Sequence, residues 1–497
     1  ERRGEPGIIG LGVQNLDEAD LISAITWQDA AVDTSDPVTV YFAGAGEFVN
    51  QEGLLLESLG FTQEERQLIL GGLRTASTFA DIEFTQTGDQ DTADFQIART
   101  DLSDLDSDLV GLANPIGSSF YSDGVILLDD DTYWTEPALR KGGLMNHIIV
   151  HEFGHALGLA HPHDYGGFSR PFPGVRESYE VGDFDLNQTP FTAMTYNEYW
   201  NGPIANEPQN EGSGYLWGFG TLDMIALQEI YGANEAYRSG GNDYLLGRNN
   251  WFEAIWDTGG VDKIRYTGTE NVTIDLRPAT GAYEDLGGGG VSYIEDGRSG
   301  FAIGKDVEIE RAAGGRGKDT ILGNALDNKL EGRNNGDEIS GFDGSDTILG
   351  GNGNDLLLGN NGPDLIQGGK GKDEIFGGRG SDTLLGNRDD DFIDGGSNDD
   401  TIDGGLGNDT VIGGNGDDLL EGGGGADVFV FDDNDGTDTI IDFNEADFID
   451  LSDTGLSFGE ISIDVNGSTA QVQFGATTIN FTNLAADLDS SDFILAS

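Results

Sequence analysis

The chain has 497 residues, of which 90 are Asp or Glu, 25 are Lys or Arg and none is Cys, so its formal net charge is −65. This charge argues against nucleic acid and anionic membranes as partners, because both are polyanions. The absence of Cys excludes thiolate metal ligands, a disulfide framework and a cysteine-based inhibitory switch within the chain.

The sequence has no apolar run of 18 residues and no basic-plus-apolar leader. We therefore expect a mature form or export by a route without such a leader. Glycine supplies 79 residues, against a usual share of about 7%, mostly in the second half, and Lys and Arg are absent from Asp389 to Ser497. This shift predicts two domains, over residues 1–240 and 241–497.

Residues 1–240 alternate short strands and helices, which predicts an α/β (α+β) domain with a sheet packed against two long helices. Thr62 and Glu65 form a capping box that opens a helix. The polar segment 111–121 suits a sheet edge. Strands are expected at 38–42, 82–84, 95–98 and 125–128, and further helices at 145–159 and 222–231, the last closed by Gly232.

The most specific motif, H-E-x-x-H-x-x-G-x-x-H, lies in the helix at 145–159 and the turn after it. His151 and His155 are one helical turn apart on one face, so both imidazoles can bind one Zn²⁺. Gly158 can adopt a positive φ and return His161 as a third ligand. Three protein ligands leave one position open, as in catalytic zinc sites, and Glu152 is placed to act as a general base.

All five histidines lie between residues 147 and 163. His147 is one turn before His151, where a helix diverges from a bound metal. A role beside the ligands or at the surface therefore fits His147 better than a fourth ligand position. His163 follows Pro162 and is expected in a loop.

From Gly314 to Val430 the 117 residues divide into thirteen nonapeptides of the form G-G-x-G-x-D-x-U-x, where U is apolar. The period predicts an all-β parallel β-roll in which six Gly-rich residues turn, x-U-x forms a short strand and two repeats close one coil. Carbonyls and carboxylates at the turns suit Ca²⁺, and without it we expect disorder. The copies from Gly323, Gly386 and Gly395 match least well. A flexible Gly/Asp-rich linker is disfavoured by the fixed register.

After the repeats, the segments 427–431, 440–443 and 448–451 are expected to form strands. Residues 461–474 are expected to form a hairpin, with Asn466 and Gly467 at its turn. Residues 431–497 are therefore predicted to cap the roll.

A Met-containing turn, Thr192-Ala193-Met194-Thr195-Tyr196, follows the zinc motif, and this combination is the metzincin signature. With Pro162 after the third histidine, and with the repeats, the chain resembles the serralysin family of zinc metalloproteases with RTX calcium-binding repeats. The resemblance implies that Met194 packs beneath the ligands. It also implies that Tyr196 is a further zinc ligand and an oxyanion stabiliser, and that Glu152 is the general base.

The resemblance also implies calcium ligands. Residues 256–262 resemble a calcium-binding element that precedes the repeats in this family. The expected ligands there and in the repeats are Arg238, Gly240, Asp257, Gly259, Gly260, Asp262, Glu310, Gly315, Gly317, Asp319, Asn328, Asp337, Asp346, Gly351, Gly353, Asp355, Asp364, Gly369, Gly371, Asp373, Gly378, Gly380, Asp382, Asp400, Gly405, Gly407, Asp409, Gly414, Gly416 and Asp418.

The implied function is that of a secreted zinc-dependent endopeptidase of a Gram-negative bacterium, which hydrolyses extracellular proteins. One catalytic zinc and roughly eight structural calcium ions are expected. The expected partners are protein or peptide substrates, a small protein inhibitor and the type I secretion apparatus, whose uncleaved signal residues 492–497 resemble. The chain is expected to be a monomer.

The charge that remains after calcium binding suggests a marine or otherwise saline habitat. One alternative function is a calcium-dependent adhesion protein without enzymatic activity, against which the complete zinc motif argues. Another is a metzincin of a different family, which Pro162 and the absence of Cys disfavour.

Overall fold

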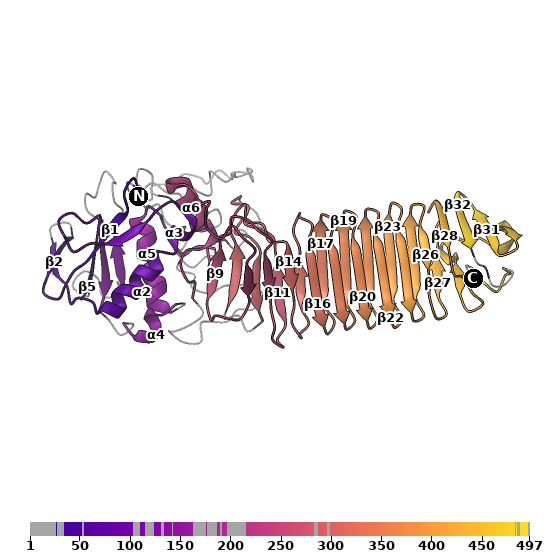
Figure 1. Cartoon of the computed structure of the whole chain (residues 1–497), viewed down its shortest axis with the longest axis horizontal. Coiled ribbons are helices and arrows are strands. Elements are labelled where there is room, and N and C mark those ends of the chain that lie inside the picture. The colour runs from indigo at the N-terminus through magenta and orange to yellow at the C-terminus, as the bar shows by residue number, and fades with distance from the viewer. Residues whose placement is uncertain are drawn as a thin grey trace, which may run out of the picture.

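In the computed structural model the chain is elongated, with an α/β unit at one end and a long β-structure that runs to the other end (Figure 1). The structure describes residues 26, 34–51, 54–102, 110–114, 124–130, 134–141, 143–162, 175, 186–188, 191–195, 215–282, 287–295, 299–482, 484 and 488–495. Within these residues, no helix is both long and apolar enough to cross a membrane.

The α/β unit contains a five-stranded sheet in the order β4-β1-β5-β7-β6. Its strands are β1 (Val38–Phe42), β4 (Phe84–Gln86), β5 (Phe95–Thr100), β6 (Gly111–Ala113) and β7 (Gly124–Asp129). All neighbours are parallel except β6, which is antiparallel to β7 and forms the predicted edge. The strand expected at 82–84 begins only at Phe84, because the amides of Asp81 and Ile82 bond to Gly232 and Ala80 instead of a strand.

The helices are α2 (Gln63–Leu73), α3 (Ala76–Phe79), α4 (Glu136–Leu139), α5 (Leu144–Ala156) and α6 (Thr221–Tyr231). The predicted capping box opens α2, with Glu65 N donating to Thr62 Oγ1 at 3.2 Å and Thr62 N to Glu65 Oε2 at 2.6 Å. Helix α5 ends three residues earlier than expected, because the chain leaves the helix before Gly158, whose φ is 99°. Gly232 ends α6, as predicted, with a φ of 86°.

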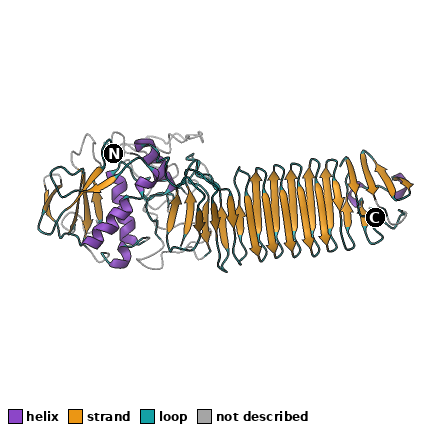
Figure 2. Ribbon diagram, in the orientation of Figure 1, coloured by secondary structure: helices purple, strands orange, loops and turns teal. Residues whose placement is uncertain are grey.

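Helices α2 and α5 lie between the small sheet and the β-structure (Figure 2). One face of the sheet, with Val40 and Ile97, packs against Phe153 of α5 in a large buried apolar cluster. A hairpin of β2 (Phe48–Gln51) and β3 (Leu54–Glu57) covers the other face. This packing places the helix of the zinc motif directly against the edge strand β6.

The β-structure consists of two 13-stranded sheets. The first contains β8 (Asp243–Leu245), β10 (Lys263–Arg265), β14 (Arg311–Ala313), β16 (Lys329–Asn334), β18 (Thr347–Asn352), β20 (Leu365–Lys370), β22 (Thr383–Arg388), β24 (Thr401–Leu406), β26 (Leu419–Glu421), β28 (Thr437–Ile440), β30 (Ser462–Asn466), β31 (Thr469–Phe474) and β32 (Thr477–Thr482). The second contains β9 (Phe252–Ile255), β11 (Val272–Asp275), β12 (Val291–Ile294), β13 (Gly300–Ile303), β15 (Thr320–Leu322), β17 (Glu338–Asp343), β19 (Leu356–Asn361), β21 (Glu374–Arg379), β23 (Phe392–Ser397), β25 (Thr410–Asn415), β27 (Val428–Val430), β29 (Phe448–Asp450) and β33 (Phe493–Ile494). Two short 3₁₀ helices cover Ser452–Thr454 and Phe458–Glu460.

Successive repeats alternate between the two sheets, and each strand pairs in parallel with the strand two repeats later, as Ile348 does with Ile366. Two repeats therefore close one coil, which confirms the predicted parallel β-roll. The regular strands are six residues long instead of the expected three. They lengthen because residues of the Gly-rich segment also pair, as Gly351 does with Gly369. The side chain at the apolar position of every repeat is fully or almost fully buried. Each repeat therefore contributes one apolar side chain to the core between the two sheets.

The segment 241–313 also belongs to these sheets, through β8 to β14. Its residues Phe252, Tyr293 and Ala302 are part of the buried cluster of the α/β unit. The apolar core therefore continues past residue 240, where the composition changes, and the proposed domain limits stay a prediction.

At the far end, the strand expected at 440–443 lies at 437–440 (β28), where its last residues, Thr439 and Ile440, pair with Leu419 and Leu420 of β26. The hairpin of β30 and β31 is confirmed, although Gly467 and Ser468 form its turn, since Asn466 pairs with Thr469. The last strand, β33, pairs with β29 and buries Phe493.

Candidate metal centres

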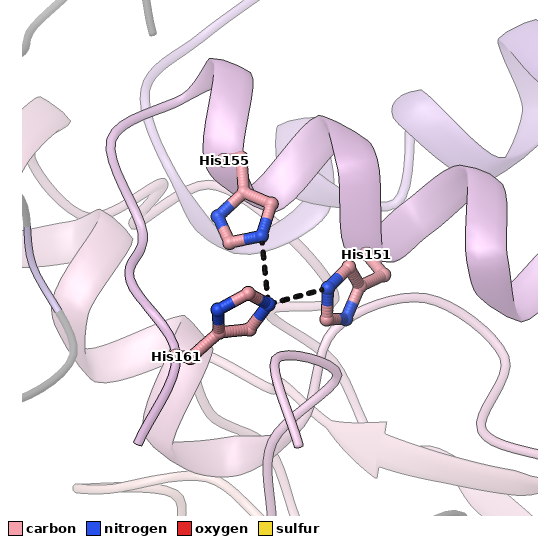
Figure 3. Close-up of side chains that lie close together, drawn as sticks. All are labelled: His151, His155 and His161. Carbon is pink, nitrogen blue, oxygen red and sulfur yellow. Dashed lines mark hydrogen bonds between the residues drawn. The ribbon is translucent and has the colours of Figure 1, made fainter. Parts of the chain in front are cut away.

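The side chains of His151, His155 and His161 converge at the end of α5 (Figure 3). His161 Nε2 is 3.0 Å from His151 Nε2 and 3.0 Å from His155 Nε2. Helix α5 sets the first two imidazoles one turn apart, and the positive φ of Gly158 returns the third toward them. The structure thus brings together the three histidines that the motif names, and that they bind zinc stays a prediction.

Hydrogen bonds fix the tautomers of two of these rings. His151 Nδ1 is 2.8 Å from the carbonyl oxygen of Ala193, and His155 Nδ1 is 3.0 Å from that of Leu159. A carbonyl can only accept, so each Nδ1 carries the proton and each Nε2 keeps its lone pair. Burial and the neighbouring His155 and His161 hold the pKa of His151 well below its usual value. Neutral rings with converging lone pairs fit a zinc ion.

The turn containing Met194 lies beneath this cluster. Met194 is fully buried, and a side chain at Gly154 of α5 would collide with its sulfur. The carbonyl of Ala193 in the same turn accepts the hydrogen bond from His151. The turn thus supports the helix and orients one proposed ligand.

Asp223 of α6 holds that turn in place, and sequence analysis missed it. Its carboxylate accepts hydrogen bonds from Thr192 Oγ1 and Ala193 N, both at 2.6 Å, and from Gly220 N at 2.9 Å. Burial raises the pKa of Asp223 to about 6, although these hydrogen bonds favour the ionised form. The link between α6 and residues 192–193 has no sequence spacing that could have revealed it.

Glu152 is 7% exposed, and its carboxylate lies against Gly111 of the edge strand β6. Burial raises the pKa of Glu152 to about 8. A cation held by the adjacent histidines would favour the ionised form, which a general base requires.

Tyr196, the predicted fourth ligand, and His163 lie outside the described residues. His147 is buried and stacks on Tyr215, with ring centroids 5.9 Å apart. Burial lowers the pKa of His147 to about 4. Among the described residues, the convergent cluster contains only the three histidines of the motif.

In the roll, the residues at position 6 of the repeats form two hydrogen-bonded ladders. From Asp337 onward, Oδ1 of each Asp accepts from the backbone N–H of the position-6 residue one coil earlier, over 2.7–3.1 Å along the two ladders. For example, Asp355 accepts from Asp337, and Asp364 accepts from Asp346. The repeated Asp therefore fixes the register between coils.

The other oxygen of these carboxylates, Oδ2, is buried and has no hydrogen-bond partner within the described part of the roll. A side chain at the position-1 glycine of the same repeat, such as Gly350 beside Asp355, would collide with it. An unpaired buried carboxylate oxygen is costly unless a cation or a proton neutralises it. The oxygen-rich turns therefore fit calcium. These oxygens belong to Asp337, Asp346, Asp355, Asp364, Asp373, Asp382, Asp391, Asp400, Asp409, Asp418, Asp427 and Asp438.

The pKa values of these carboxyl groups reflect their burial. Burial, reinforced by neighbouring carboxylates, raises the pKa of Asp337, Asp391 and Asp400 to about 8. Burial alone raises the pKa of Asp355 to about 6. Without a cation, the roll would therefore take up protons near neutral pH.

Asn328 departs from this arrangement. Its side-chain amide accepts from Asn324 N at 2.8 Å and donates to Asn324 Oδ1 at 3.0 Å, so its polar atoms are satisfied inside the turn. The copies from Gly386 and Gly395 instead keep the regular geometry, because Asn387, Asp389 and Asn398 adopt the positive φ values of the glycines they replace. Each predicted calcium ligand in the repeats stays a prediction.

The ladders extend past the thirteen nonapeptides, which sequence analysis also missed. Asp438 Oδ1 accepts from Asp418 N at 3.0 Å, and Asp447 Oδ1 accepts from Asp427 N at 3.1 Å. Both residues lie 20 positions after their donors instead of 18. The fragment Gly436-Thr437-Asp438-Thr439-Ile440 matches the end of the repeat pattern and could have revealed the first of them.

The expected ligands before the repeats also come together. Asp257 and Asp262 are joined by Asn242, whose Nδ2 is 3.0 Å from Asp257 Oδ2 and whose backbone N is 2.5 Å from Asp262 Oδ1. Glu310 Oε2 accepts from Asp262 N at 2.7 Å, and Asp262 Oδ2 is buried without a partner among the described residues. Gly240 and Gly260 are in backbone contact, the carbonyl of Arg238 accepts from Thr258 N at 3.4 Å, and Gly259 N donates to Asp257.

Two family profiles match the chain. The profile described as Matrixin matches residues 58–187. The profile described as RTX calcium-binding nonapeptide repeat (4 copies) matches residues 322–357, 349–384, 358–393, 376–411 and 394–429. The first covers the helix and turn that carry the three histidines, and the second covers most of the regular roll.

Curated relatives include metallopeptidase AprA of Pseudomonas marginalis, which is 33% identical over 43% of this chain and 43% of its own length. Serralysin of Proteus mirabilis is 31% identical over 39% of this chain and 38% of its own length. The chain therefore spans less than half the length of these relatives. A solved structure, the extracellular lipase LipA from Serratia marcescens, is 19% identical over 36% of this chain and 40% of that chain, with a TM-score of 0.16.

The lipase match is too weak to carry an argument about the fold. The Matrixin profile coincides with the site of convergent histidines, and the repeat profile with the carboxylate ladders. The chain thus joins a region that matches the Matrixin profile to repeats that match the RTX calcium-binding profile, and it is similar to metallopeptidases of the serralysin family.

Proposed function

We propose that the chain is a secreted zinc-dependent endopeptidase whose roll is folded by calcium. The observation that carries the proposal is the convergence of three buried imidazoles beside Glu152 and a sheet edge. His151, His155 and His161 would hold the zinc. When bound, zinc acidifies a water molecule and polarises the scissile carbonyl.

The other steps belong to residues of the chain. Strand β6, at the edge of the described sheet, would offer main-chain hydrogen bonds to an extended peptide. Glu152, which lies against β6, would take a proton from the attacking water and deliver it to the leaving amine. Tyr196 would donate a hydrogen bond to the oxyanion, a role that rests on its place in the sequence motif.

The partners and the location follow from the same proposal. Protein substrates, export by the type I apparatus and an extracellular location agree with the repeats and with the serralysin relatives, whereas a small protein inhibitor stays a prediction from the sequence. The monomeric state, the Gram-negative source and the saline habitat stay predictions from the sequence.

Metal analysis combined with a protease assay tests the proposal. We expect one zinc per chain and casein hydrolysis that 1,10-phenanthroline abolishes and added zinc restores. Zinc binding without any peptidase activity in the calcium-loaded chain would contradict the enzymatic function and favour a calcium-dependent adhesion protein.

A further inference from the structure

We propose that Gly111 is a positioning residue for Glu152, and that the edge strand carries a glycine there so that the carboxylate of the base can lie against it. This inference rests on the function proposed above. Gly111 is the first residue of β6, and Glu152 is on α5, which packs against this strand.

The space between the two residues is too small for any side chain. A Cβ atom built on Gly111 would lie 2.6 Å from Glu152 Oε1, 2.7 Å from Cγ and 2.8 Å from Cδ. Non-bonded carbon atoms prefer a separation of about 3.5–4.0 Å, so even a methyl group would displace the carboxylate. Glu152 is only 7% exposed, so the neighbouring groups also limit where it could go.

The backbone itself does not require glycine at this position. Gly111 is absent from the residues with positive φ, and it pairs with Leu128 in regular antiparallel register. Any residue can adopt such a strand conformation. Gly158, by contrast, needs its φ of 99° to return His161. The contact with Glu152 is therefore the structural reason for a glycine at 111.

This contact joins two parts of the proposed reaction. Strand β6 would hold the substrate main chain, and its first residue fixes the carboxylate that exchanges the proton. The three residues of β6 would therefore fix the distance between the bound substrate and the carboxylate of Glu152. Displacement of a catalytic group by about 1 Å can lower a rate about 100-fold.

The first test is Gly111→Ala in the full chain loaded with zinc and calcium. We expect kcat to fall about 10- to 100-fold with zinc affinity unchanged, because the three atoms nearest to a Cβ on Gly111 all belong to Glu152. Gly88→Ala is the matched control, since Gly88 has no positive φ and no atom within 4 Å of a built Cβ. Full activity of Gly111→Ala, or a loss of zinc affinity, would overturn the inference.

A stability cycle tests the same contact without peptidase activity. Gly111→Ala should lower the thermal unfolding midpoint by about 3–6 °C when Glu152 is present, and leave it unchanged in the Glu152→Ala background, where the colliding atoms are gone. An equal fall in both backgrounds, or no fall in either, would contradict the contact. If the unmodified chain proves inactive, the proposed function fails while this cycle still tests the role of Gly111.

Discussion

The α/β unit and the roll are stabilised in different ways. In the α/β unit, sheet and helices bury a broad apolar cluster that includes Phe95 and Phe153, and a buried carboxylate such as Asp223 has three hydrogen bonds. In the roll, each repeat adds one apolar side chain, such as Ile348, and most repeats add a buried carboxylate oxygen without a hydrogen-bond partner among the described residues. We therefore expect packing to hold the three histidines in place and cations to stabilise the roll.

The largest expected effect is the difference between removing calcium and removing zinc. Removing calcium with EGTA at pH 8 should abolish the strand signal of the roll in circular dichroism, because unpaired carboxylates would then line up one coil apart. Removing zinc with 1,10-phenanthroline should abolish activity and leave that signal intact. An unchanged strand signal in EGTA would show that the roll, like the α/β unit, folds without calcium.

Within the α/β unit, Glu152→Gln should lower peptidase activity by about 10²- to 10⁴-fold. Zinc content and the calcium-dependent strand signal should not change, because Glu152 is beside the histidines but not among them. Activity and metal content measured on one preparation check this expectation. Retained hydrolysis in a preparation free of other proteases would refute the role of Glu152.

A smaller effect is expected at Asp223. Replacement by Ala removes the acceptor of Ala193 N, whose carbonyl orients His151, so zinc affinity should fall about 10- to 100-fold. Asp223→Asn keeps one oxygen for the backbone amides and should lose less. The exposed Glu229→Ala on the same helix is the control. Equal zinc affinities in competition with a chromogenic chelator would show that packing alone fixes the site.

The smallest and most gradual effect is expected from pH on the calcium-free roll. Burial raises the pKa of Asp337 and Asp391 to about 8, whereas an unfolded Asp titrates near 3.9. The folded roll therefore binds protons more tightly, and the stability that they contribute is complete below about pH 4 and lost as pH rises through about 8.

Calcium-free protein should accordingly recover strand signal between pH 8 and pH 5. The calcium-loaded protein is the control, because protons and calcium compete for the same oxygens and acid should not strengthen its roll. If the calcium-free strand signal were independent of pH, the unpaired oxygens would not be what destabilises the roll.

Local patterns predicted much of this molecule. The capping box at Thr62, the three histidines and the register of the repeats all depend on residues close together in sequence, and the structure shows them as predicted. The shift of β28 to 437–440 was not predicted, because its limits depend on pairing with β26, about 20 positions earlier.

Contacts between distant segments were also missed. Asp223 meets residues about 30 positions earlier, and Gly111 meets Glu152 across 41 positions, so neither pair leaves a periodic signal in one sequence. The strands of the roll were predicted to have three residues instead of six for a related reason. The pairing partners of the Gly-rich residues lie a full coil away.

The carboxylate ladders also give the roll a direction. In every ladder bond the backbone N–H of one coil donates to the carboxylate of the following coil, and the last acceptors are Asp438 and Asp447. A roll shortened from its C-terminal end would leave buried amides, such as those of Asp418 and Asp427, without acceptors. At its N-terminal end, a shortened ladder would instead lose donors to its carboxylates, which can accept from water or calcium. The two ends of each ladder are therefore not equivalent, because the position-6 amides of a coil find their carboxylate acceptors only in the coil that follows.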